Sequence, residues 1–160
     1  MFIIVNLDQE KIVLGNKLDD LAISLKKLAN TLLRSEVSSY LIEPQIINRI
    51  LKIADRISQL KSLEENEGEI FASSLKDMVD IIQSIGDISR SPQRPSYEEK
   101  NKIIRTFKNL AEEIMDFIPV IRNLDYEGEK IKYETFGGLL QKLVDAIQEK
   151  RHMFIQEDSK

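Results

Sequence analysis

The chain has 160 residues, of which 42% are apolar and 31% are charged, and its formal net charge is -4. This length suits one domain over residues 1–160, and this apolar content can form a core without a disulfide or a metal. The absence of cysteine excludes disulfides, thiolate nucleophiles and cysteine metal ligands, and it is compatible with a reducing cytoplasm. The mild acidic excess gives no overall field that would attract nucleic acid or an anionic membrane.

The chain begins with a short apolar run, Met1-Phe2-Ile3-Ile4-Val5. Asn6 and Asp8 end this run, and no basic residue precedes it as in a signal peptide. No stretch approaches the roughly 20 apolar residues that a membrane span requires. We therefore expect a cytoplasmic protein with no membrane span. We interpret residues 1–7 as an apolar arm, either a short strand or an extended segment, and a hairpin of Phe2–Asn6 with Lys11–Leu14 is a weaker alternative.

Five later stretches carry an apolar stripe that advances alternately by four and three residues. This spacing places each stripe on one face of an α-helix, at the period of helical bundles and coiled coils. The stripes are Leu14, Leu18, Leu21, Leu25, Leu28 and Leu32; Ile46, Ile50, Ile53, Ile57 and Leu60; Phe71, Leu75, Met78, Ile82 and Ile85; Ile103, Phe107, Leu110, Ile114, Phe117, Ile121 and Leu124; and Phe136, Leu140, Leu143, Ile147 and Phe154.

The first helix is expected from about Gln9 to Arg34, with Asp8 as its N-terminal cap. Gly15 lies inside the pattern and is a place where this helix could bend or split. The second helix is expected to begin at Pro44, because the missing N–H of proline has no partner in a first turn. It should run to about residue 63.

The third helix is expected to follow Asn66, which forms a capping-box pattern with Glu69, and to end near residues 86–89. Residues 89–95 contain two prolines and two arginines and are interpreted as an exposed linker. Ser96 and Glu99 form a second capping box at the start of the fourth helix. Pro119 lies within the fourth stripe, which stays in phase beyond it, so we expect a kink rather than a stop.

The fifth helix is expected to begin near Thr135 and to end in a polar tail over residues 156–160. Its pair Gly137-Gly138 fits a close backbone approach of two helices or a loose first turn. Short connections between helices of about 20 residues favour antiparallel neighbours. The sequence therefore predicts an all-α, antiparallel up-and-down bundle of about five helices with a short apolar N-terminal arm. Its expected core contains Leu21, Leu25, Ile50, Ile57, Leu75, Ile82, Phe107, Leu110, Ile114, Leu143 and Ile147.

Glu149 and His152 have the Glu-x-x-His spacing of di-iron bundles. Such a site needs two of these motifs, and the chain has a single histidine. We therefore interpret the pair as a solvent-exposed helix end, where Lys150, Arg151 and His152 favour the helix dipole. The sequence has no Gly-x-Ser-x-Gly motif and no phosphate-binding glycine loop. We expect no enzymatic activity, no cofactor and no metal site.

The second helix carries a basic stripe, Arg49, Lys52, Arg56 and Lys61, against a single Asp55. Such a stripe could contact a phosphate backbone, so a nucleic-acid-associated accessory protein is the alternative function. An antiparallel hairpin would place the acidic third helix beside this stripe, and intramolecular charge pairing is then the simpler account. The acidic residues are Glu64, Glu65, Glu67, Glu69, Asp77, Asp80 and Asp87.

Further apolar residues flank the stripes of the first, second and fourth helices. Burial in a multi-helix core is the simpler explanation of these wide faces, and a second apolar surface that binds another chain is the functional one. The apolar arm favours the functional explanation, a surface that binds another chain. We expect a non-enzymatic protein–protein interaction module, acting as an adaptor, a regulator or a self-assembling subunit, in a homodimer or a stable hetero-complex. The candidate partner-binding residues are Phe2, Ile3, Ile4, Val5, Ile23, Leu33 and Ile118.

Overall fold

The computed structural model describes residues 2–35, 42–86, 95–123 and 130–156, and the side chains of 11–35, 42–86, 95–122 and 135–155. These residues form helices, with no strand among them. The helices are α1 (Phe2–Leu33), α3 (Pro44–Gln59), α4 (Glu65–Ser84), α5 (Tyr97–Asn123) and α6 (Lys130–Gln156).

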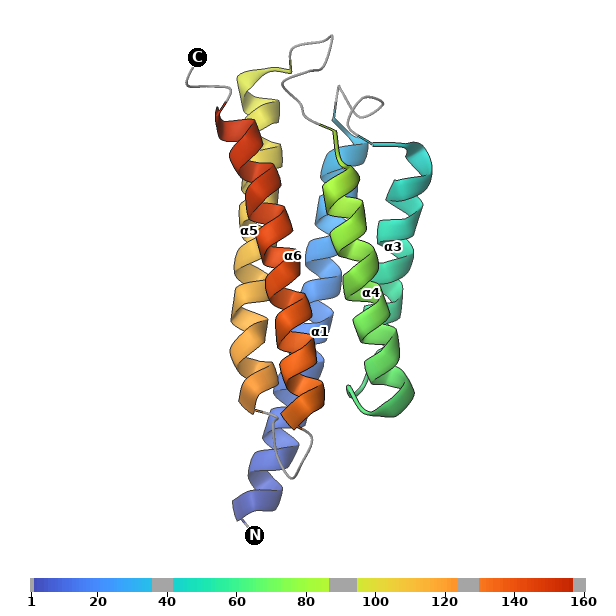
Figure 1. The fold of residues 1–160 in the computed structure, drawn as a ribbon, viewed down its shortest axis with the longest axis vertical. Coiled ribbons are helices and arrows are strands. Elements are labelled where there is room, and N and C mark those ends of the chain that lie inside the picture. The colour runs from blue at the N-terminus through green and yellow to red at the C-terminus, as the bar shows by residue number, and fades with distance from the viewer. Residues whose placement is uncertain (1, 36–41, 87–94, 124–129, 157–160) are drawn as a thin grey trace.

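The helices form an up-and-down bundle, in which each helix runs opposite to the one before it (Figure 1). Each helix packs mainly against two others, which gives a ring in the order α1, α3, α4, α6, α5 and back to α1. The pair α5 and α6 has the most extensive contact, and the pair α3 and α4 has the least extensive contact in this ring. The predicted fold class is confirmed.

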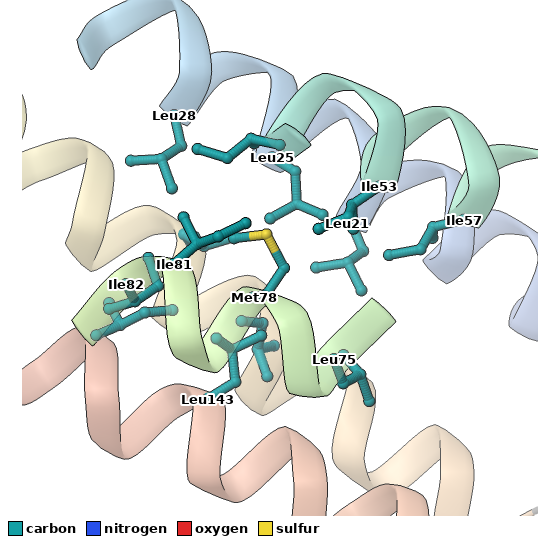
Figure 2. Packing of buried hydrophobic residues seen from close by; sticks show 14 of the residues in the cluster. Leu21, Leu25, Leu28, Ile53, Ile57, Leu75, Met78, Ile81, Ile82 and Leu143 are labelled. Carbon is teal, nitrogen blue, oxygen red and sulfur yellow. The ribbon is translucent and has the colours of Figure 1, made fainter. Parts of the chain in front are cut away.

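The core occupies the inside of this ring. Every stripe residue with a described side chain is buried, as is every residue of the expected core; Leu124 lies outside the described residues. Figure 2 shows Leu21, Ile53, Met78 and Leu143, from four different helices, lying close together. Burial of each such side chain stabilises the fold by about 1.5–3 kcal/mol. The apolar periodicity therefore identifies the core.

Phe71 of α4 joins three helices through its ring. Its centroid lies 5.7 Å from that of Phe117 in a stacked arrangement and 5.6 Å from that of Phe136 in an edge-on arrangement. Phe107 and Phe154 form a third ring pair, with centroids 5.7 Å apart. Such pairs contribute about 0.5–1.5 kcal/mol beyond the area that they bury. They link α5 to both α4 and α6.

The interpretation of residues 1–7 as a strand or an extended arm is wrong for residues 2–7, which form the first turns of α1. Extending an existing helix needs no new nucleation, so a short apolar segment can join the long leucine helix that follows. Asp8 lies inside α1 and does not cap it, and Gly15 does not interrupt it. Figure 1 shows the N-terminal end of α1 projecting beyond the ends of the other helices.

The turn between α3 and α4 is closed by Glu67, and not by the predicted capping box of Asn66 and Glu69. The Oε2 atom of Glu67 accepts hydrogen bonds from the backbone N–H of Lys61 at 2.8 Å and of Ser62 at 3.4 Å. Its Oε1 atom accepts a hydrogen bond of 3.0 Å from the Ser62 hydroxyl. These bonds favour the charged carboxylate and lower the pKa of Glu67. The turn therefore begins directly after Gln59, so α3 is shorter than predicted.

Gly68 is the glycine at which two segments approach closely. A Cβ atom at this position would lie 2.5 Å from the carbonyl oxygen of Leu63 and 3.1 Å from Cζ of Phe136. No atom lies within 4 Å of a Cβ atom built on Gly137 or Gly138, so the expected close approach at that pair is wrong. Gly137 and Gly138 also lie well inside α6, which begins at Lys130 rather than at Thr135.

The start of α5 agrees with the sequence. The hydroxyl of Ser96 accepts a hydrogen bond of 3.1 Å from the backbone N–H of Glu99, as an N-cap does. The helix continues through Pro119 to Asn123 without a stop. The expected linker, apart from Pro95, and residues 157–160 of the expected tail lie outside the described residues.

Candidate functional site

The projecting end of α1 exposes large apolar side chains. Ile12 is 63% exposed and Val13 is 43% exposed, whereas Leu14, the first stripe residue, is only 3% exposed. The four predicted contact residues Phe2, Ile3, Ile4 and Val5 lie in the helix just before them, and their side chains lie outside the described set. Ile12 and Val13 were not predicted as contact residues, since they lie within the expected first helix but off its apolar stripe.

Ile23 continues the apolar character of α1 outside the core. It is 51% exposed and follows Ile12 by eleven residues, which is close to three helical turns, so both lie on the same outward face. Leu33 is 55% exposed near the end of the same helix. Ile118 of α5 is only 8% exposed and belongs to the core, so its prediction as a surface contact residue is wrong. Helix α5 buries a wider face than one seam needs, because it packs against both α1 and α6.

The basic residues of α3 lie on its solvent side. Arg49, Lys52 and Arg56 are exposed and follow one another at spacings of three and four residues, which places them on one face. The fourth predicted member, Lys61, lies beyond the end of α3 in the turn that Glu67 closes. We name Arg49, Lys52 and Arg56 the basic row of α3.

The only acid within α3 is already paired with another helix. The carboxylate of Asp55 lies 3.4 Å from Nζ of Lys26 on α1. None of the three residues of the basic row forms an ion pair with a described carboxylate. The expected charge pairing between α3 and α4 is therefore not made by direct ion pairs in the part of the chain that the structure describes.

A recess of about 580 Å³ lies where α3 meets α4. The recess is lined by a basic, an acidic and an apolar side chain, those of Arg56, Glu69 and Ile70. Asn66 and Ser73 also line it. Ile70 is 42% exposed although its neighbour Phe71 is fully buried. Ile70 stands one residue off its stripe, as the buried Ile118 does, so spacing alone predicts neither the exposure of Ile70 nor its place in the same recess as Arg56.

A second recess, of about 370 Å³, lies between α1 and α5 and is mostly polar. Glu113 faces it and forms an ion pair of 3.9 Å with Lys17, while Thr31 and Thr106 share a hydrogen bond of 3.3 Å between the same helices. The remaining lining residues are Ser24, Lys27, Asn109, Leu110, Glu112 and Asp116. Its polar groups belong to the packing of α1 on α5.

Glu149 and His152 are the residues considered for metal binding. Glu149 and His152 are both exposed on α6. Within the described ranges, no group of three or more histidine, aspartate or glutamate residues is placed to hold a metal ion. The arrangement that a catalytic metal needs, three protein ligands around one ion, is therefore not formed by these side chains.

Among the residues described, no helix has an apolar stretch long enough to cross a membrane. Comparison of the chain with protein-family models, with curated proteins and with solved structures gave no match in any of the three.

Proposed function

We propose that this protein is a non-enzymatic protein–protein interaction module that binds another protein chain through the N-terminal end of α1. The observation that carries this proposal is the position of that end. It extends past the rest of the bundle (Figure 1), and its first described apolar side chains, Ile12 and Val13, are exposed. Apolar residues grouped on a projecting helix are typical of a surface that a partner covers.

The energy available at this end is large enough for a specific contact. Removing one large apolar side chain from water contributes about 1.5–3 kcal/mol, and the segment has Phe2, Ile3, Ile4 and Val5 before Ile12 and Val13. A projecting helix can enter a groove of a partner or pack beside a second copy without disturbing the ring of helices. Adaptors, regulators and self-assembling subunits all use contacts of this kind.

Deleting residues 1–7 tests the proposal. We expect the deletion to lower the particle mass measured by multi-angle light scattering, with a loss of helix signal in circular dichroism that matches the deleted turns alone. If this segment instead stabilised its own bundle, deletion would lower the melting temperature and leave the mass unchanged. That second result would contradict a contact role for α1.

A point substitution separates contact from folding more sharply. Ile12→Gln introduces a residue with good helix propensity and removes an exposed apolar side chain, so we expect weaker association with no loss of melting temperature. Ile155→Gln is the matched control, because Ile155 is a 39% exposed isoleucine on α6. Equal effects of the two substitutions on particle mass would count against the proposed site.

A further inference from the structure

We propose that the face formed by α3 and α4 binds a second copy of this chain, in a parallel two-fold dimer held by complementary charges. This surface is distinct from the N-terminal end of α1 and does not depend on the function proposed for that end. The proposal rests on the basic row of α3, on acidic residues of α4 and on the recess between the two helices.

The α3 side of this face is positively charged and available. Asp55 lies on the flank of α3 toward α1, where it pairs with Lys26, whereas Arg56 lines the recess toward α4. Arg49 lies seven residues before Arg56, two helical turns away on the same side. Because none of the row is ion-paired with a described carboxylate, its charges can interact with another molecule.

The α4 side supplies the opposite charge at matching heights. Glu69 lines the same recess as Arg56, so these two residues mark one level of the face. The helices α3 and α4 are antiparallel. Seven residues from Arg56 toward the start of α3, and eight residues from Glu69 toward the end of α4, therefore reach the same height on the face, about 10–12 Å from the first level. Arg49 lies at that level on α3, and Asp77 lies there on α4. Asp77 is half-buried and lies seven residues after Ile70, on the same side of α4, while the exposed Lys76 lies seven residues after Glu69. The face therefore carries the basic row of α3 beside α4 charges of both signs, with Glu69 and Asp77 as its acids.

Arg56 and Glu69, which lie at one level of the face, are self-complementary under one symmetry operation. A two-fold axis parallel to α3 and α4, in front of the face, places α3 of one copy opposite α4 of the other at the same level. Arg56 then meets Glu69 of the second copy, and Arg49 meets its Asp77. A two-fold axis perpendicular to the helices would instead place the basic row against itself, which like-charge repulsion disfavours.

The same features favour this partner over a polyanion. Nucleic acid lying along the basic row would also lie beside Glu69 and Asp80, both exposed on α4, and the whole chain has a net charge of -4. The exposed Ile70, which lines the same recess as Arg56 and Glu69, adds apolar contact, which a protein surface can use and a phosphate backbone cannot. In the parallel dimer both N-terminal ends of α1 project from the same end of the particle.

The test uses exchange of charge between two full-length variants, Arg56→Glu and Glu69→Arg. Each variant is immobilised in turn, and its binding to itself, to the other variant and to the wild type is measured by surface plasmon resonance. Each variant should bind itself at least about tenfold more weakly than the wild type binds itself, because like charges then face each other. Arg56→Glu should bind Glu69→Arg as well as the wild type binds itself, since that pair restores opposite charges at both contacts.

The control variant is Lys142→Glu, which reverses an exposed charge on α6 and should leave self-binding unchanged. Wild-type self-binding should also weaken steeply with added salt. The proposal would be overturned if Arg56→Glu bound Glu69→Arg no more tightly than each variant binds itself. That result would show that Arg56 and Glu69 interact only within one chain or not at all.

Two other outcomes would also overturn it. Equal binding in every combination would show self-association through another surface, such as α1, and would leave the function proposed for α1 standing. Absence of wild-type self-binding, together with binding of duplex DNA or RNA that Arg56→Glu abolishes, would assign the basic row to nucleic acid instead.

Discussion

The Nζ atom of Lys150 donates a hydrogen bond of 2.5 Å to the carbonyl oxygen of Ile85, which joins the C-terminal half of α6 to the end of α4. A longer bond, of 3.4 Å, reaches the carbonyl oxygen of Gln83. Lys150 is 9% exposed, so most of its side chain is buried, and the expectation that it lies on a solvent-exposed helix end is wrong. The last carbonyl groups of a helix have no partner within that helix, and a cation placed there also interacts favourably with the helix dipole.

We expect Lys150→Met to lower the free energy of unfolding by about 1.5–3 kcal/mol, the usual size for a hydrogen bond to a charged group. Methionine keeps the apolar stem and removes the donor. Urea denaturation followed by circular dichroism measures the change. Lys142→Met, on the exposed side of the same helix, is the control and should change the free energy by less than about 0.5 kcal/mol. Equal losses of unfolding free energy in the two variants would show that the hydrogen bonds of Lys150 do not stabilise the protein.

The turn between α3 and α4 should be sensitive to acid through Glu67. Its pKa is lower in the folded protein than in the unfolded chain, because Lys61 and Ser62 donate hydrogen bonds to its carboxylate. Stabilisation by Glu67 is therefore fully present above the unfolded pKa and is lost as the pH falls through the lower, folded value. We expect the wild type to lose more stability than Glu67→Gln when the pH is lowered from about 7 to about 3.

Urea denaturation at both pH values provides this measurement, and Glu149→Gln is the control because Glu149 is an exposed glutamate on α6, away from this turn. At neutral pH, Glu67→Gln should itself cost about 1 kcal/mol, as the loss of a helix-terminal carboxylate bond does. A Glu67→Gln protein that loses as much stability in acid as the wild type would show that these bonds do not favour the charged form.

Two glycine substitutions should have opposite effects. Gly68→Ala would place Cβ 2.5 Å from the Leu63 carbonyl oxygen, a backbone atom, and overpacking of this kind costs about 1–3 kcal/mol. Gly15→Ala meets no atom within 4 Å inside α1 and should stabilise the protein by up to about 1 kcal/mol through helix propensity. Thermal melting of the two variants distinguishes them. A melting temperature raised by Gly68→Ala would mean that the turn adjusts freely.

The packing of α5 is tested at Leu110, which is 1% exposed. Leu110→Ala leaves a cavity between packed helices, and we expect it to lower the free energy of unfolding by about 2–5 kcal/mol. Urea denaturation measures this loss. Replacement of the exposed Met115 by alanine on the same helix is the control and should cost far less. A cost below about 0.5 kcal/mol at Leu110 would contradict the buried stripe of α5.

The sequence determined the helices and the core, because both depend on a local period. An apolar stripe that repeats about every 3.5 residues can be buried only if its segment is helical and that face turns inward. Phe107, Ile50 and Leu143 could therefore be assigned to the core from their spacing alone, and they are fully buried. Ser96 could be assigned as a cap for the same reason, since its hydrogen bond reaches only three residues along the chain.

The tertiary structure decided the helix ends and the surface, because these depend on which segments become neighbours. Glu67, and not Asn66, closes the turn because that turn brings Lys61 and Ser62 to its carboxylate. Ile118 is buried and Ile23 is exposed, although each lies beside a stripe, because α5 and α1 turn different flanks toward their neighbours in the ring. Spacing along one helix does not fix the order of helices around the core, and that order decides which flanks remain exposed.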